Sequence, residues 1–312
     1  MYYPPRRNRR KPRQRKIRLC VLAGVLTVSI SAAAFFHAEG SPILENLFEA
    51  SEQAEDAQND AQEEPSITVD DSLMPGKRAS RTQIWLNPAQ AKEGVETPTF
   101  IALCLHEVRD DKPDDPLAVK VEDFRKIVQE FKAQGFMFLD SNDIIAIKNG
   151  KMQQPAKAVF LGFDDGYEDN YTNAFPIIRQ EGVKATFFLV TGSIGKEGRM
   201  TVPQLKEMAA AGMCFGSHTV NHDEMDLLTK EQVHSALNDS KYTLEHDFGI
   251  KVGSFAYPLG YDSNTAISEA KNYYDIAFTA SMDENTPDTM YTIHRFGVFR
   301  WNHSADSILQ NK

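Results

Sequence analysis

The stretch AVFLGFDDG, residues 158–166, sets the pattern of the folded part of the chain, because an apolar run leads directly into two carboxylates and a glycine. A short apolar run of this kind is typical of a strand buried on both faces of a parallel sheet. Similar runs occur at residues 99–108, 185–190, 213–216, 254–257 and 276–280. Segments with helical spacing lie between them, at residues 121–135, 173–180, 202–211, 230–248 and 265–273. This alternation predicts an α/β fold with a largely parallel sheet, either open or closed into a barrel.

Polar residues follow four of these predicted strands. His106 ends the first run, Asp164 and Asp165 follow the second, His218 follows the fourth, and Tyr257 ends the fifth. In parallel α/β folds, ligands bind outside the carboxyl ends of the strands. We therefore expect these side chains to converge on one rim of the sheet.

The residue types at this rim indicate metal-assisted hydrolysis. Asp164 and Asp165 repel each other unless a cation compensates them, so one carboxylate could ligate a metal while its neighbour stays free as a base. A solvated Asp-Asp-Gly turn is the alternative. His218 and His222 are four residues apart, which would place them on one face of a helical turn within reach of one ion. Two histidines and one carboxylate leave open positions, as in catalytic zinc sites.

Three short motifs resemble those of a known family. FDDG (163–166), SHTVNH (217–222) and FAYPLG (255–260) are similar to the first three motifs of the polysaccharide deacetylase family, the NodB-homology carbohydrate esterases. The resemblance extends over about residues 99–300. It implies a distorted (β/α) barrel that hydrolyses N-acetyl groups of sugar polymers, usually with zinc (Zn2+), although another divalent transition metal could serve.

The resemblance also implies a role for each matching residue. Asp164 matches the general base that deprotonates the attacking water. Asp165, His218 and His222 match the metal ligands. Tyr257 stands where the family supplies a backbone N–H to the oxyanion, a contact of about 3 kcal/mol in comparable sites.

Two histidines compete for the role of the general acid. LCLHEVRDD (103–111) resembles the first motif of a subgroup, the extracellular poly-N-acetylglucosamine deacetylases and their wall-glycan relatives, in which the acid histidine moves to the first strand. That resemblance favours His106 over His294, the match to the common late motif. The usual motif arginine is replaced by Ala256, and Arg295 is a candidate substitute.

The N-terminal third divides into segments of contrasting charge. Residues 1–18 carry nine basic side chains, and residues 19–36 carry no charge over about the minimum length of a membrane span. The positive-inside rule then sends residue 37 onward out of the cytoplasm. A cleaved signal peptide is the alternative, because Ala32-Ala33-Ala34 suits a signal peptidase. We expect an acidic tether at 37–96 and the catalytic domain at 97–312.

Charge and cysteine content exclude several classes of protein. From Lys77 onward there are 25 basic and 33 acidic residues, so we expect no nucleic-acid partner. Three cysteines rule out a disulfide scaffold, and Cys104 and Cys214 are expected as free, buried thiols. Trp301 is expected in the core, with a sugar-binding platform as the alternative. We expect a monomer.

Together these features predict an enzyme held at the cell membrane by a single span, or released by signal cleavage, with its catalytic domain outside the cytoplasm. Its substrate would be the N-acetylglucosamine of a cell-wall glycan, either peptidoglycan or the linkage unit of a wall polysaccharide. The first rival hypothesis is a poly-β-1,6-N-acetylglucosamine deacetylase, although some of those enzymes use a longer histidine spacing than the four residues seen here. A catalytically silent glycan-binding homologue and an O-acetyl esterase are the second and third rival hypotheses.

Overall fold

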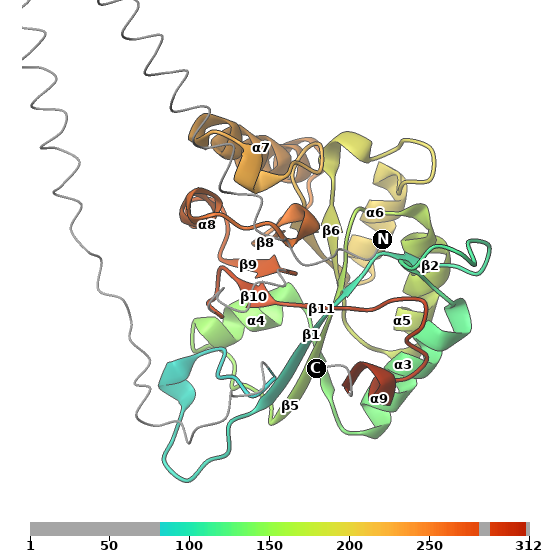
Figure 1. Ribbon diagram of the computed structural model, residues 1–312, viewed down its shortest axis with the longest axis vertical. Coiled ribbons are helices and arrows are strands. Elements are labelled where there is room, and N and C mark those ends of the chain that lie inside the picture. The colour runs from blue at the N-terminus through green and yellow to red at the C-terminus, as the bar shows by residue number, and fades with distance from the viewer. Residues whose placement is uncertain (1–81, 281–287, 310–312) are drawn as a thin grey trace, which may run out of the picture. The chain divides into compact units, whose positions relative to one another are not determined.

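The structure is a computed structural model that describes residues 82–280 and 288–309 (Figure 1). The predicted basic stub at 1–18, the membrane span at 19–36 and the tether up to residue 81 lie outside the described residues. Within the described part of the chain, no helix is both long and apolar enough to cross a bilayer.

Nine strands form one sheet in which every pairing is parallel. The strand order is β10-β9-β8-β7-β6-β5-β1-β11, and β4 pairs with β5 off this path. The strands are β1 (Thr99–Leu105), β4 (Met137–Leu139), β5 (Lys157–Phe163), β6 (Thr186–Leu189), β7 (Cys214–Ser217), β8 (Ser254–Ala256), β9 (Ile276–Thr279), β10 (Ile293–His294) and β11 (Phe296–Gly297). A separate two-stranded sheet joins β2 (Glu107–Val108) to β3 (Ala118–Val119).

The last two strands bring the edges of the sheet together. β10 pairs with β9 at one edge, and β11 pairs with β1 at the other, yet only Arg295 separates β10 from β11 along the chain. Figure 1 shows β11 beside β1 in the centre of the molecule. The sheet is therefore a nearly closed parallel barrel, and the predicted distorted (β/α) barrel is confirmed.

Helices surround the strands, as the alternating pattern predicts (Figure 1). They are α3 (Val121–Ala133), α4 (Ser141–Lys148), α5 (Phe175–Glu181), α6 (Val202–Ala210), α7 (Lys230–Tyr242), α8 (Asn264–Ala270) and α9 (Ala305–Leu309). Asp140 and Thr229 close capping boxes at the starts of α4 and α7. A π-helical turn, η3 (Asn170–Ala174), precedes α5, and a second, η6 (Thr243–Asp247), extends α7.

Strand alternation sorts the apolar side chains into two clusters. On β1, Ile101, Leu103 and Leu105 pack in the cluster shared with the helices. Phe100 and Ala102 belong to a second cluster. That second cluster draws on seven strands and thus fills the barrel interior, with Phe100, Leu139, Phe160, Phe188, Ala256, Phe278 and Ile293 among its members. Successive side chains point to opposite faces, so Cys104 also faces inward.

The folded domain begins upstream of residue 97, where the sequence analysis places the end of the tether. Leu86 is 2% exposed and joins the inner cluster. Its N–H donates to Gln154 Oε1 at 2.7 Å, and Asn87 Nδ2 donates to the carbonyl of Ile147 at 2.9 Å. The predicted boundary at 97 is therefore too late, because the short apolar stretch at residues 84–86 gave no sign of this long-range packing.

Replacing Leu86 with alanine should lower the free energy of unfolding by about 2–5 kcal/mol, because the change leaves a cavity in the inner cluster. Chemical denaturation of the full chain measures this loss. Val95→Ala is the matched control, since Val95 is 54% exposed and its truncation should cost less than about 0.5 kcal/mol. Equal stability of Leu86→Ala and the unaltered protein would contradict the packing described here.

Candidate active site

Except for Tyr257, the residues predicted to converge meet at the carboxyl ends of the strands. His106 follows β1, Asp164 and Asp165 follow β5, and His218 follows β7. Because β1, β5, β6 and β7 pair in parallel, their carboxyl ends lie at the same edge of the barrel. The alternation of strands and helices thus positions the polar residues.

The loops at this edge hold an unusual backbone conformation. Among the described residues, the non-glycine residues with positive φ are Asp165 (72°), Thr219 (66°), His222 (61°) and Leu259 (59°). All four lie in loops that follow β5, β7 or β8. Such conformations cost of order 1–3 kcal/mol each and gather at functional sites, where the surrounding structure holds them. The strain is therefore concentrated at this edge of the barrel.

Asp165, His218 and His222 form a group whose ligand atoms lie within 4.8 Å of one another. Asp165 Oδ1 is 3.5 Å from His218 Nε2 and 3.3 Å from His222 Nε2. The sequence predicted this proximity, but it attributed it to a helical turn. Residues 219–221 form an irregular turn instead, which Asp223 closes by donating its N–H to Thr219 Oγ1 at 3.0 Å.

The protonation state of this group suits a metal ion. His218 Nδ1 is 2.7 Å from the carbonyl of Ala256, so Nδ1 carries the proton and the Nε2 lone pair faces Asp165. Burial lowers the pKa of His218 to about 4, which keeps the ring neutral at pH 7. Asp165 Oδ1 is buried without a hydrogen-bond partner. A buried carboxylate oxygen facing two imidazole nitrogens fits a divalent cation such as zinc.

Asp164 has different partners from its neighbour. Arg295 donates from Nη1 to Oδ1 and from Nη2 to Oδ2, both at 2.7 Å. Cys104 Sγ lies 3.3 Å from Oδ2 and donates its proton, because burial raises the pKa of the thiol. Burial would also raise the pKa of Asp164, but the Arg295 charge and the Arg295 hydrogen bonds outweigh that effect and lower the pKa. Asp164 is therefore an ionised carboxylate in a fixed position.

The barrel interior is shaped to hold this guanidinium. The Arg295 guanidinium lies 5.1 Å from the ring centroid of Phe188 and 5.9 Å from that of Phe278. A Cβ at Gly162 would stand 3.1 Å from Nη1, so glycine leaves the required space. Arg295 thus contacts the Asp164 carboxylate from the segment between β10 and β11, whereas Ala256 lies on β8.

The two candidate acid histidines lie in different places. His106 belongs to a group with Cys104 and Asp164 whose ligand atoms lie within 4.8 Å of one another, and its Nδ1 is buried without a partner. Asn170 fixes its backbone by donating to the His106 carbonyl at 2.7 Å. His294 precedes inward-facing Arg295 on an extended segment, so it points away from the interior and contacts Phe296.

The structure contradicts the role expected for Tyr257. Its backbone N–H donates to the carbonyl of Phe278 at 3.0 Å, and its side chain is fully buried. An N–H bound within the sheet is not available to an oxyanion. The strand β8 ends at Ala256, but Tyr257 keeps this one hydrogen bond to β9 before the short helical turn Pro258–Gly260 begins.

Three supporting residues, Cys104, Arg199 and Tyr167, were not identified from the sequence. Cys104 was interpreted as a core thiol, although its alternation with Ala102 already placed it on the inner face. Arg199 donates from Nη1 to the Asp165 carbonyl at 2.8 Å and packs 3.9 Å from the ring centroid of Tyr167. No local pattern marks Arg199, because its partner lies 34 positions earlier.

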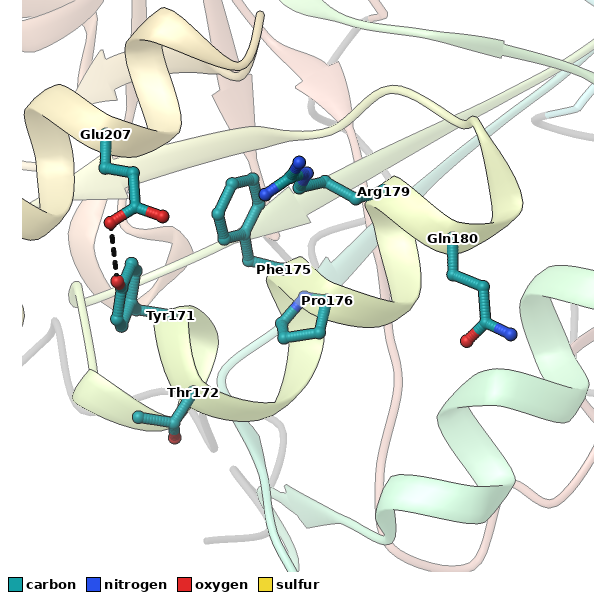
Figure 2. Close-up of a pocket in the computed structure, with 7 residues that line it drawn as sticks. All are labelled: Tyr171, Thr172, Phe175, Pro176, Arg179, Gln180 and Glu207. Carbon is teal, nitrogen blue, oxygen red and sulfur yellow. Dashed lines mark hydrogen bonds between the residues drawn. The ribbon is translucent and has the colours of Figure 1, made fainter.

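A separate groove lies on the outer helices rather than at this site. Figure 2 shows its lining on η3, α5 and α6, where Tyr171 donates its hydroxyl proton to Glu207 at 2.7 Å. The Phe175 ring stacks with Tyr171 at a centroid distance of 6.0 Å, and Arg179 packs against the Phe175 ring. None of the predicted site residues lines this groove.

Replacing Arg295 with alanine should lower the free energy of unfolding at pH 7 by about 3–5 kcal/mol, because it leaves the Asp164 carboxylate buried and unpaired. Asp164→Ala and the double variant complete a thermodynamic cycle, measured by chemical denaturation. The double variant should lose less than the sum of the single variants. Since the pKa of Asp164 is lowered by folding, the contribution of the pair should be complete above about pH 4 and disappear as pH falls through the folded-state pKa. Additive losses would show that the two groups do not interact.

Comparison with known proteins points to one family. Residues 151–274 match the sequence profile of the polysaccharide deacetylase family. The Bacillus subtilis protein YxkH, which carries the name of a polysaccharide deacetylase, is 29% identical over 78% of this chain and 87% of its own. The poly-beta-1,6-N-acetyl-D-glucosamine N-deacetylase of Staphylococcus epidermidis is 28% identical over 65% of this chain and 79% of its own.

A solved structure shares both the fold and part of the sequence. The Streptococcus pyogenes deacetylase PplD, in complex with acetate, superposes with a TM-score of 0.62 and 27% identity. The match covers 69% of this chain and 98% of that protein. The profile match over residues 151–274, the relatives and the barrel agree with the three sequence motifs, and all of them point to a polysaccharide deacetylase domain.

Proposed function

We propose that the domain is a metal-dependent de-N-acetylase acting on the N-acetylglucosamine residues of a cell-wall glycan. The observation that carries the proposal is the different environment of two adjacent carboxylates. Asp165 faces two histidine nitrogens, whereas Asp164 is held ionised by Arg295. One carboxylate is thus prepared to bind a cation, and the other to accept a proton.

Asp165, His218 and His222 would hold the metal, which would supply Lewis-acid polarisation of the acetamide carbonyl and of a water molecule. Asp164 takes the proton of the attacking water as its oxygen bonds to the acetyl carbon. Arg295 occupies both carboxylate oxygens from one side, so the carboxylate cannot rotate away from the acetyl group.

His106 provides the proton that the leaving group needs. As the carbon–nitrogen bond breaks, His106 donates to the nitrogen, and the products are acetate and a free amine on the sugar. The position of His106 beside Asp164, on the barrel edge, supports this role. The outward direction of His294 argues against that residue as the acid.

The oxyanion requires a different donor from Tyr257. Leu259 lies on the loop that follows β8, and its φ of 59° is strained for a leucine. We assign the donor role to its backbone N–H, because a left-handed residue at a strand end reorients the peptide that precedes it. A backbone donor also tolerates the leucine side chain at this position.

A biofilm polymer is the second candidate substrate. The Staphylococcus epidermidis relative is named for poly-beta-1,6-N-acetyl-D-glucosamine, and its match covers 65% of this chain. The four-residue step between His218 and His222 supports the wall-glycan substrate. Acetate release from the two polymers, compared at equal concentrations of acetyl groups, decides between them.

The proposal also places the domain outside the cytoplasm. The uncharged stretch at 19–36 after nine basic residues supports a membrane anchor with the domain on the far side. Protease added to intact cells should then degrade the domain, whereas a cytoplasmic marker protein stays intact. Protection of both would contradict this location.

Asp164→Asn and His106→Ala should each lower kcat for acetate release by about 10²–10⁴, because each removes a group that transfers a proton. The measurement uses the full chain and N-acetylated wall glycan, with poly-N-acetylglucosamine as the second substrate. His294→Ala is the matched control and should retain activity. A loss in His294→Ala equal to that in His106→Ala would overturn the assignment of the acid.

The full chain should bind one zinc ion, and His218→Ala and His222→Ala should weaken that binding strongly. Zinc in excess should raise the Tm of the unaltered protein, because an ion that binds only the folded state stabilises it. Calorimetric titration and thermal unfolding measure both effects. His234→Ala is the control, since His234 lies on α7 away from the site and is exposed. Unchanged zinc affinity in His218→Ala would exclude this metal site.

A further inference from the structure

An exposed tryptophan stands at the same edge of the barrel as the candidate active site. Trp301 is 50% exposed, so the expectation of a core residue is wrong. Its ring stacks on Phe299 with centroids 4.8 Å apart and planes 19° apart. One face of the indole is therefore covered by Phe299, and the other is open to solvent.

The turn that carries Trp301 is held at several points. Phe299 N–H donates to Asn302 Oδ1, and Asn302 N–H donates back to the Phe299 carbonyl, both at 2.8 Å. Between them, Arg300 donates its N–H to the Pro116 carbonyl and its Nη1 to the Ala118 carbonyl, again at 2.8 Å. The indole is thus presented on a fixed support, which lowers the entropy lost when a ligand binds.

The strand beneath also makes room for the stack. A Cβ at Gly297 would stand 2.6 Å from Phe299 Cζ, closer than real contacts allow. Glycine at this position lets the Phe299 ring lie against β11, and Trp301 in turn lies against Phe299. The Trp301 ring is therefore supported from behind by the Phe299 ring, which is itself supported by β11.

The position of the turn connects it to the active site. β11 is the parallel neighbour of β1, with Gly297 opposite Cys104, and Val298 N–H donates to the Cys104 carbonyl at 2.9 Å. His106 lies two residues after Cys104, and Phe299 lies two residues after Gly297. The parallel register therefore brings the start of the turn to the level of His106. Because neighbouring strands are about 4.8 Å apart, the turn leaves the barrel next to the proposed acid.

A hollow of about 310 Å³ opens beside the indole. Its lining combines the apolar surface of Trp301 and two prolines with side chains of both charges, including Asp114 and Lys120. A sugar ring has apolar C–H faces and hydroxyl groups at its edge, and it matches an aromatic face surrounded by hydrogen-bonding groups. The mixed charge of the lining gives no preference for a strongly charged ligand.

We propose that Trp301 and this hollow form a second sugar subsite, which binds a hexosamine of the glycan chain other than the one that loses its acetyl group. The inference rests on the proposed function and extends it, because it makes the enzyme selective for long chains. The sugar ring stacks on the open face of the indole, and the polar lining binds its hydroxyl groups.

Kinetics on oligosaccharides of two lengths test this subsite in the full chain. The probes are the N-acetylglucosamine dimer and pentamer, both fully acetylated. For the unaltered protein, kcat/KM should be higher for the pentamer. Trp301→Ala should raise the KM for the pentamer about tenfold, the effect of losing one buried aromatic contact. Trp301→Phe should restore most of the preference for the pentamer.

Tyr242→Ala is the matched control for the loss of an exposed, stacked aromatic. Tyr242 is 54% exposed at the end of α7 and stacks on His246, yet it lies on no loop of the active edge. It should keep the preference of the unaltered protein for the pentamer. A preference that survives in Trp301→Ala, or that is lost equally in Tyr242→Ala, would overturn the subsite.

Fluorescence provides a readout that does not depend on turnover. The chain has two tryptophans, Trp85 and Trp301, so in Trp85→Phe the emission comes from Trp301 alone. The pentamer should change this emission in a saturable way, and the dimer should do so only at much higher concentration. If the unaltered protein released no acetate, the proposed function would fail, and this titration would decide the subsite by itself. An emission that the pentamer leaves unchanged would overturn the subsite even in an active enzyme.

Discussion

The buried ion pair between Arg295 and Asp164 connects the closure of the barrel to its chemistry. Arg295 is the single residue between β10 and β11, which pair with opposite edges of the sheet. Its guanidinium spans the interior to the carboxylate that follows β5. A buried pair of this kind is weak evidence for net stability, because both ions lose their hydration. Its value here is positional, since the same contact fixes the last strand and orients the proposed base.

The adjacent carboxylates then differ because their backbones differ. Asp165 has a φ of 72°, and this left-handed turn directs its side chain toward the histidines while that of Asp164 stays over the barrel interior. Two neighbouring carboxylates in one environment would share a proton or repel each other. In this fold Asp164 is paired with the Arg295 guanidinium, and Asp165 faces the two histidines. Asp165 can therefore bind a cation while Asp164 accepts a proton.

The sequence revealed those features that depend on local pattern. Apolar runs and helical spacing predicted the barrel, and the ends of the runs predicted that His106, Asp164, Asp165 and His218 would meet. The failures concern contacts between distant segments. Arg295 lies 131 positions from Asp164, so the sequence could name it as a candidate but could not place it on the carboxylate.

The remaining differences have similar physical reasons. Packing of Leu86 onto the inner cluster depends on the completed barrel, and the short apolar stretch at residues 84–86 does not reveal it locally. The Tyr257 N–H bonds to β9 one residue beyond the end of β8 at Ala256, and a motif cannot show to within one residue where such bonding stops. Trp301 was expected in the core because large aromatics usually are buried, and only the fixed turn from Phe299 to Asn302 explains its exposure.

The central claim is that this site hydrolyses an amide and not an ester. The most direct measurement quantifies acetate and free amine together, after the zinc-loaded full chain has acted on an N-acetylglucosamine oligomer. The account predicts equal amounts of the two products, and neither product in Asp164→Asn. Acetate released from O-acetylated glycan without any new amine, or no acetate from any glycan despite bound zinc, would contradict it.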